Sequence, residues 1–265
     1  MIFTVYRLEL FKMRKRLAAW VTYLCFCLLT TLTFGGQFYA AQHSHGRGYF
    51  GFPNSLPMIL TGGTSVASIF GVVLVVLLVG NEFDWKTSRQ NIIDGLSKPQ
   101  WFAGKALLIP TIAVTLYLAV LAIGGTLAFI GTSAAQPHGI DPTSTYLLAA
   151  CGALLAMACN GSIALLIALS VRSTGPALAV ALIYQVFDSI AANVLRGLHL
   201  RATADCLPIQ VHNALLVYSQ YLPAGSVARS QLDSHWQTGI LFLAATLWVT
   251  GLLCASYRVY MKRDL

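Results

Sequence analysis

The chain has 265 residues, of which 57% are hydrophobic and only 10% are charged. A soluble domain carries about 25% charged residues, so this composition excludes an ordinary soluble fold and indicates a membrane protein. The formal net charge of +8 is assigned to membrane topology and to contact with lipid headgroups of the bilayer, and no nucleic-acid partner is expected.

Six stretches are long and apolar enough to cross a bilayer, which requires about 20 mainly apolar residues. They predict an all-α membrane protein with one transmembrane domain over 1–265. The predicted spans cover roughly 17–39, 58–80, 106–130, 146–170, 175–195 and 238–258. The first span follows a basic segment but is too long for a secretory signal peptide, so we expect a retained anchor.

The distribution of basic residues predicts the orientation. Most of the 17 Lys and Arg residues lie in the N-terminal segment, the connection between spans two and three, the turn between spans four and five, and the C-terminal tail. Six spans place all of these segments on one side of the membrane, and basic connections remain cytoplasmic. We therefore expect a multi-pass protein of the bacterial cytoplasmic (inner) membrane with both termini in the cytoplasm.

Residues 1–16 predict an N-terminal interfacial helix, which lies on the cytoplasmic membrane surface before the first span. Its apolar residues at helical spacing are Phe3, Tyr6, Leu10, Met13 and Leu17. Arg7, Lys12, Arg14 and Lys15 are assigned to its polar faces. The alternative is a basic flank with no defined helix.

Residues 84–97, between spans two and three, predict a short cytoplasmic helix. Its apolar residues are expected to share one face, and Gly95 and Pro99 mark its end. These apolar residues are Trp85, Ile92, Ile93 and Leu96. A short amphipathic helix in this position either lies on the membrane or fills a groove in a soluble partner.

Polar residues within the later spans are candidates for a substrate pathway. Asp188 and Gln185 lie in span five and Asn160 lies in span four. A carboxylate at membrane depth costs roughly 2.5–3.5 kcal/mol, so such a residue usually faces a cavity or a partner. The alternative for Asp188 is an acid near the external end of its span that water reaches.

An external insertion, 196–237, separates spans five and six. Its apolar stretch between Pro208 and Pro223 is too short to cross a bilayer. We expect external re-entrant helices in this insertion, formed as a hairpin of short segments.

In the segment after span two, the chain resembles the permease subunits of type-2 ABC transporters. The matching residues are Glu82, Thr87, Arg89, Ile92, Ile93, Ser97, Lys98 and Lys105. Lys86 stands where that family commonly has Gly. Glu9 and Lys12, in their basic surroundings, are similar to the N-terminal helix of the family, and the six-span layout with a long external segment is similar throughout.

The resemblance implies that 84–97 is a coupling helix that docks into an ATPase subunit. The residues assigned to ATPase coupling are Glu82, Trp85, Lys86, Arg89, Ile92, Ile93 and Leu96. Two copies of a separate ABC ATPase would bind ATP and Mg and hydrolyse the ATP. A second permease subunit, as a homodimer or a close relative, would complete the transport path, with spans two and five at the interface between the halves.

The expected function is export of an amphipathic compound such as a peptide antibiotic or drug, with antibiotic resistance as its outcome. The chain lacks a GxxxxGK[ST] loop, so it is not expected to be an enzyme, and no cofactor or metal is expected on it. One alternative is a lipid or glycan export permease. Another is a membrane metal- or haem-assembly protein that uses the external histidines. These are His43, His45, His138, His199, His212 and His235.

Overall fold

The computed structural model describes residues 2–43, 50–52, 55–132, 143–217 and 237–263. Within these ranges every regular element is a helix, and six helices are long and apolar enough to cross a membrane. The chain is therefore a multi-pass membrane protein of all-α class, and the six predicted spans are confirmed. The long helices are α2 (Leu17–His43), α3 (Leu56–Asp84), α5 (Lys98–Gly131), α6 (Thr143–Val171), α7 (Thr174–Gly197) and α11 (Thr238–Lys262).

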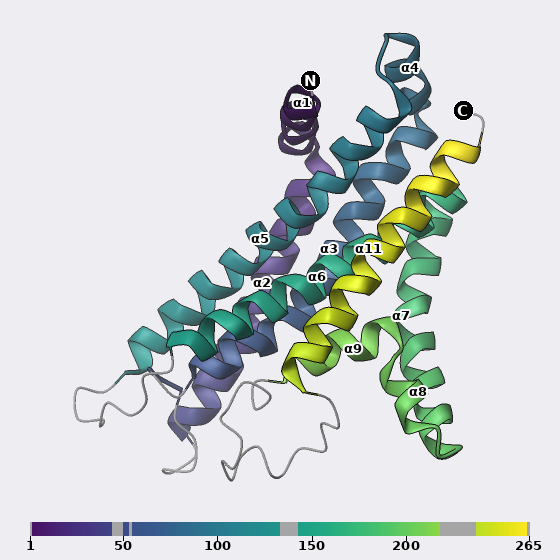
Figure 1. Ribbon diagram of the computed structural model, residues 1–265. Coiled ribbons are helices and arrows are strands. Elements are labelled where there is room, and N and C mark those ends of the chain that lie inside the picture. The colour runs from purple at the N-terminus through teal and green to yellow at the C-terminus, as the bar shows by residue number, and fades with distance from the viewer. Residues whose placement is uncertain (1, 44–49, 53–54, 133–142, 218–236, 264–265) are drawn as a thin grey trace.

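Four shorter helices complete the described part of the chain. They are α1 (Ile2–Lys15), α4 (Thr87–Ile93), α8 (Arg201–Asp205) and α9 (Pro208–Leu215). Figure 1 shows α1, α4 and the C-terminal end of α11 at one end of the bundle, with α8 and α9 toward the opposite end. We call the first of these the α4 end of the bundle.

Local sequence signals explain where several helices begin. α5 starts with a capping box in which Ser97 and Gln100 each satisfy a backbone group of the other. α9 opens on Pro208, whose missing N–H costs nothing in a first turn. α7 begins at Thr174, and Pro176 lies in its first turn, where proline is tolerated.

α3 and α6 form the centre of the bundle (Figure 1). In each of these two helices, 61% of an 18-residue apolar stretch is buried inside the protein. The corresponding share is 11% for α11 and 17% for α7. Large side chains from α2 and α5 complete the core, including Phe26, Phe34 and Leu116, none of which exceeds 1% exposure. The outer helices α7 and α11 therefore leave most of their apolar surface available to lipid or to another chain.

The segment 84–97 differs from the helix expected over it. α3 continues to Asp84, the chain turns at Trp85 and Lys86, and α4 covers only Thr87–Ile93. Lys86 has φ 56° and ψ 15°, a left-handed conformation that cannot continue a right-handed helix. This single residue separates α4 from α3 and shortens the predicted helix.

The expected common face of the 84–97 segment is also wrong. Trp85 and Ile93 are 64% and 70% exposed. Ile92 is half-buried, and Leu96 packs against the core. Because the turn at Lys86 rotates the chain, the four apolar residues no longer follow one helical stripe.

Part of the apolar spacing predicted for α1 faces the bundle, because Leu10 and Met13 pack against the core near the buried Val5 and Glu9. Phe3 is exposed, and Leu17 is the first residue of α2. Lys12, which we assigned to a polar outer face, instead reaches a carboxylate on α3. Attraction between opposite charges in a low-dielectric interior holds this lysine toward the bundle.

Candidate functional site

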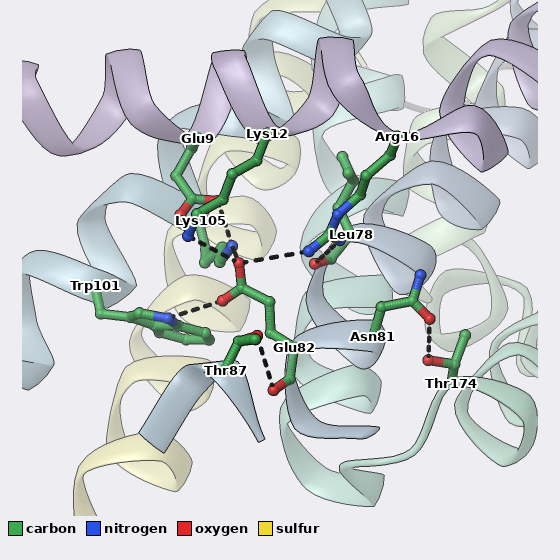
Figure 2. Close-up of polar contacts among 10 residues, drawn as sticks. All are labelled: Glu9, Lys12, Arg16, Leu78, Asn81, Glu82, Thr87, Trp101, Lys105 and Thr174. Carbon is green, nitrogen blue, oxygen red and sulfur yellow. Dashed lines mark hydrogen bonds and ion pairs between the residues drawn. The ribbon is translucent and has the colours of Figure 1, made fainter. Parts of the chain in front are cut away.

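Five charged side chains gather at the α4 end of the bundle, where α1, α3 and α5 meet (Figure 2). They are Glu9 and Lys12 of α1, Arg16 between α1 and α2, Glu82 of α3 and Lys105 of α5. We call this group the ionic cluster. It joins segments that are separated by more than 60 positions in the sequence.

Glu82 is the centre of the ionic cluster. Its Oε1 accepts hydrogen bonds from Lys105 Nζ at 2.7 Å and from Lys12 Nζ at 3.2 Å. Its Oε2 accepts one from the indole Nε1 of Trp101 at 3.0 Å. Both carboxylate oxygens are therefore occupied by donors from α1 and α5.

The remaining contacts connect the cluster to neighbouring segments. Lys105 also donates to the carboxylate of Glu9, and Lys12 contacts the same carboxylate at 2.9 Å. Arg16 lies 3.8 Å from Glu82 Oε1 and donates to the carbonyl of Leu78 at 3.0 Å. Two carboxylates thus face three cations, and the cluster carries an excess positive charge.

Burial makes these charges important to the fold. Glu82 is 1% exposed and Lys105 is 2% exposed. A buried ion of either sign is costly without its partner, so each member depends on the others. Burial alone lowers the pKa of Lys12, but the carboxylates of Glu82 and Glu9 outweigh it and leave that pKa above its ordinary value. Lys12 is therefore firmly protonated at neutral pH.

The ionic cluster also fixes the beginning of α4. The hydroxyl of Thr87 donates to the backbone carbonyl of Glu82 at 3.3 Å (Figure 2). The guanidinium of Arg16 lies 5.5 Å from the ring centre of Trp85, within cation–π range. The turn that precedes α4 is therefore in direct contact with the buried charges.

The outer surface of this segment combines apolar and basic groups. Trp85 and Ile93 are exposed, as are the side chains of Lys86 and Arg89. Ser88, between them, is buried and turns inward. Large exposed apolar groups on a short, well-anchored helix are the features of a surface that contacts another molecule.

α7 is attached to the end of α3 beside the same turn. The backbone N–H of Thr174 donates to Asp84 Oδ2 at 3.1 Å, and its hydroxyl donates to Asn81 Oδ1 at 3.0 Å. Gly80 allows the close approach, because a Cβ there would lie 2.9 Å from the Cα of Thr174. We call this contact the α3–α7 clamp.

A second polar group lies farther along α7. Asp188 is 2% exposed and accepts a hydrogen bond from Gln210 Nε2 of α9 at 3.1 Å. Gln185 donates to Asn160 Oδ1 of α6 at 2.8 Å. None of the ion pairs within the described residues includes Asp188, whose hydrogen-bond donors are therefore neutral.

The structure places the predicted residues in two separate regions. Gln185 and Asn160 of the predicted pathway contact one another, whereas Asp188 contacts α9 through Gln210. Among the predicted coupling residues, Glu82 lies inside the bundle and stabilises the segment from behind. The others lie on or beside α4, with Ile92 and Leu96 half-buried.

Sequence reasoning missed two of the residues that hold this site together. Trp101 was not singled out, and its indole N–H reaches Glu82 from the first turn of α5. Gln210 was treated only as part of the external insertion. The position of Lys105 at the start of an apolar span was a usable signal that it has a carboxylate partner, because a cation so close to hydrocarbon requires one.

Three of the six histidines lie within the described residues. The ring of His43 stacks on Tyr39 with centroids 4.0 Å apart, His199 is exposed, and His212 is buried. His45, His138 and His235 lie outside the described residues. Within the ranges described, no group of three or more His, Cys, Asp or Glu side chains is arranged to hold a metal ion.

The α4 segment, the α3–α7 clamp and two members of the ionic cluster, Glu82 and Lys105, lie within one region that is shared with other proteins, whereas Glu9, Lys12 and Arg16 precede that region. No curated protein matches the chain. A family model described as a protein of unknown function, DUF2705, matches residues 54–265, which include α3 to α11. With most of its length covered by this match, the chain belongs to the DUF2705 family.

Proposed function

We propose that this protein is the transmembrane permease subunit of an ATP-driven exporter of the type-2 ABC class. The observation that carries the proposal is the construction of the α4 end. Trp85 and Ile93 are exposed on a turn and a short helix that contact a buried ionic cluster. Four members of that cluster, Glu9, Lys12, Glu82 and Lys105, are also residues on which the chain resembles this class.

In this proposal α4 and the preceding turn are the coupling element. Ile93 and Trp85 enter a groove of an ABC ATPase, and Lys86 and Arg89 contact its rim. A helix that transmits force must not slide relative to the spans behind it. The hydrogen bond from Thr87 to Glu82 and the buried pair of Glu82 with Lys105 provide that fixed attachment.

The assembly requires two permease chains and two ATPases, which bind ATP and Mg. α7 leaves most of its apolar surface uncovered and carries the buried Asp188, so it suits a position beside the path between two chains. The proposed cargo is an amphipathic compound such as a peptide antibiotic or drug. An acid at membrane depth favours a cargo with a cationic group.

The proposed placement in the membrane follows the basic residues. The α4 end carries the N-terminal cluster, Lys86, Arg89, Arg172 and the basic end of α11, so it faces the cytoplasm of a bacterial cell with α1 in the interface. α8 and α9 then form the external re-entrant helices.

Co-purification tests the coupling role directly. The tagged chain is purified from native membranes, and a bound ABC ATPase is identified by mass spectrometry and by ATP hydrolysis. We expect Ile93→Asp and Trp85→Ala each to reduce the recovered ATPase at least tenfold, because each removes a large exposed contact. Ile130→Asp is the matched control, since Ile130 is 69% exposed next to the opposite end of α5.

The control variant should retain the ATPase and the elution volume of the wild type on size exclusion. Full recovery of the ATPase with both α4 variants would exclude α4 as the coupling element. Loss of the ATPase in the Ile130→Asp control as well would show that the α4 surface is not specifically required, which contradicts its role as the coupling element.

A further inference from the structure

A cavity of about 200 Å³ lies where α3 ends, between α4 and the turn from α6 to α7. Its lining residues are Glu82, Phe83, Lys86, Ser88, Arg89 and Arg172. We call it the basic pocket. It is distinct from the exposed surface of Trp85 and Ile93, neither of which lines it.

The basic pocket has a net positive charge. Lys86, Arg89 and Arg172 contribute three cations, and Arg172 is held over the ring of Phe83 at 5.6 Å. The one acid in the wall, Glu82, already accepts hydrogen bonds at both oxygens from Lys105, Lys12 and Trp101. The electrostatic potential of the pocket therefore favours an anion.

Two of its cations lie at backbone positions that favour glycine. Lys86 follows the end of α3 with φ 56°, and Arg172 follows the end of α6 with φ 58°. A residue in this conformation after a helix is usually Gly, because other side chains are strained there. Among the described residues only one other non-glycine, His199, has a positive φ. The backbone is thus strained at two positively charged residues that line the same cavity. Such strain indicates that the side chains of Lys86 and Arg172 have a function.

The depth of the basic pocket identifies the class of anion. α3 has 29 residues, which at about 1.5 Å per residue makes it ~43 Å long, against a hydrocarbon core of about 30 Å. Its last turn therefore lies at the level of the lipid headgroups. The exposed side of α1, at the same end of the bundle, carries Phe3, Phe11 and Arg14, a combination typical of the membrane interface.

The size of the pocket limits the ligand to a small group. Sites for drug-sized molecules usually enclose about 300–1,000 Å³. A cavity of about 200 Å³ suits a single phosphate group whose attached chains extend outside it. Arginine and lysine together provide the hydrogen bonds that phosphate oxygens prefer.

We propose that the basic pocket binds the phosphate of an anionic phospholipid headgroup through Lys86, Arg89 and Arg172. This site shares Lys86 and Arg89 with the proposed rim contact of the ATPase, but lipid binding to the purified chain requires neither an ATPase nor a transported compound, so it is tested separately from the exporter function. A bound lipid would fill the space between the ends of α3 and α6 and hold α4 and the α6–α7 turn together.

The experiment uses the full chain in a neutral detergent, with phosphatidylglycerol, phosphatidylcholine or inorganic phosphate added at matched concentrations. The melting temperature and lipid adducts in native mass spectrometry are measured. We expect phosphatidylglycerol alone to raise the melting temperature and to give a tight adduct. Arg89→Gln should weaken this binding about tenfold, since one charge-assisted hydrogen bond contributes about 1.5–3 kcal/mol. Arg89→Gln with Arg172→Gln should weaken it further.

Two more variants separate a binding site from general attraction and from structural damage. Arg14→Gln with Arg258→Gln removes two exposed cations at the same end of the bundle that do not line the pocket, and it should bind phosphatidylglycerol like the wild type. Lys86→Gly should raise the melting temperature without lipid, because it relieves the strained backbone, and should still weaken lipid binding.

Three results would overturn the proposal. Equal weakening in the Arg14 and Arg258 control would show attraction to the whole basic surface. Unchanged binding in Lys86→Gly and in the Arg89 and Arg172 variants would show that the pocket is not the site. Equal stabilisation by inorganic phosphate would assign the pocket to a free anion in place of a lipid.

Discussion

At the scale of single residues, Lys105 connects three helices at the α4 end of the bundle. Its ammonium group contacts both carboxylates of the ionic cluster, from α1 and α3, while its own backbone belongs to α5. Lys12 also pairs with both acids, but its side chain is 35% exposed, whereas Lys105 is only 2% exposed. The packing of three helices therefore depends on one buried charge.

Replacement of Lys105 by Met tests this dependence. The change keeps the length of the side chain but leaves Glu9 and Glu82 with fewer cationic partners in a buried site. We expect a loss of about 3–5 kcal/mol in the free energy of unfolding, the usual result of removing one partner from a buried ion pair. Chemical unfolding in one detergent measures it.

The partly exposed pair of Arg196 and Asp205 provides the control. Its side chains are 43% and 26% exposed and 2.9 Å apart, so solvent weakens their attraction. Asp205→Asn should cost less than about 1 kcal/mol. Similar losses for Lys105→Met and Asp205→Asn would show that burial does not make the ionic cluster important.

At the scale of helices, the α3–α7 clamp depends on the absence of a side chain at Gly80. The two segments approach until a Cβ on Gly80 would lie 2.7 Å from the Thr174 hydroxyl and 2.9 Å from its Cα. A backbone atom cannot move aside as a flexible side chain does. The same approach brings Thr174 within hydrogen-bond distance of Asn81 and Asp84.

Gly80→Ala should therefore separate α3 from α7 and cost about 1–3 kcal/mol in the free energy of unfolding, as overpacking of a close contact does. Gly71→Ala on the same helix is the matched control. A Cβ there would lie 3.7 Å from the nearest methyl of Leu116, an ordinary contact, so this variant should be neutral or more stable by about 0.5–1 kcal/mol. Thermal unfolding of both variants checks the difference, and equal stability would contradict the clamp.

The helices themselves were largely predictable from the sequence, because apolar length and basic flanks are properties of local segments. The inward position of the charged residues on α1 was not predictable. The sequence placed the helix on the membrane surface with Lys12 on a polar face, but Glu9 and Lys12 face inward because Glu82 and Lys105 lie there. The left-handed turn at Lys86 had one sequence signal, the glycine that the resembling family commonly has at this position, but lysine itself does not indicate that conformation. The inward charges of α1 depend on residues distant in the sequence.

At the scale of the whole molecule, α7 connects the two polar regions. Its first residue, Thr174, is bound to the end of α3 at the α4 end, and Asp188 lies 14 positions farther along the same helix. At about 1.5 Å per residue this separation is ~21 Å. The one proline of this stretch, Pro176, lies in the first turn of α7, where it does not break the helix. The helix therefore moves as one body, so a displacement of α3 and α4 would also move Asp188 and its partner Gln210 on α9.

The Asp188→Asn variant tests whether this acid contributes to transport in the proposed exporter. The amide preserves the size of the side chain and can still accept the hydrogen bond from Gln210, but it removes the negative charge. We expect export of a cationic amphipathic compound to fall about tenfold, while the melting temperature and the recovery of the ATPase remain unchanged. Asp205→Asn, which changes a half-buried acid whose partner Arg196 is exposed, should transport like the wild type. Unchanged transport in Asp188→Asn would exclude this residue from the pathway. α7 would then move during transport without any contribution from the negative charge of Asp188.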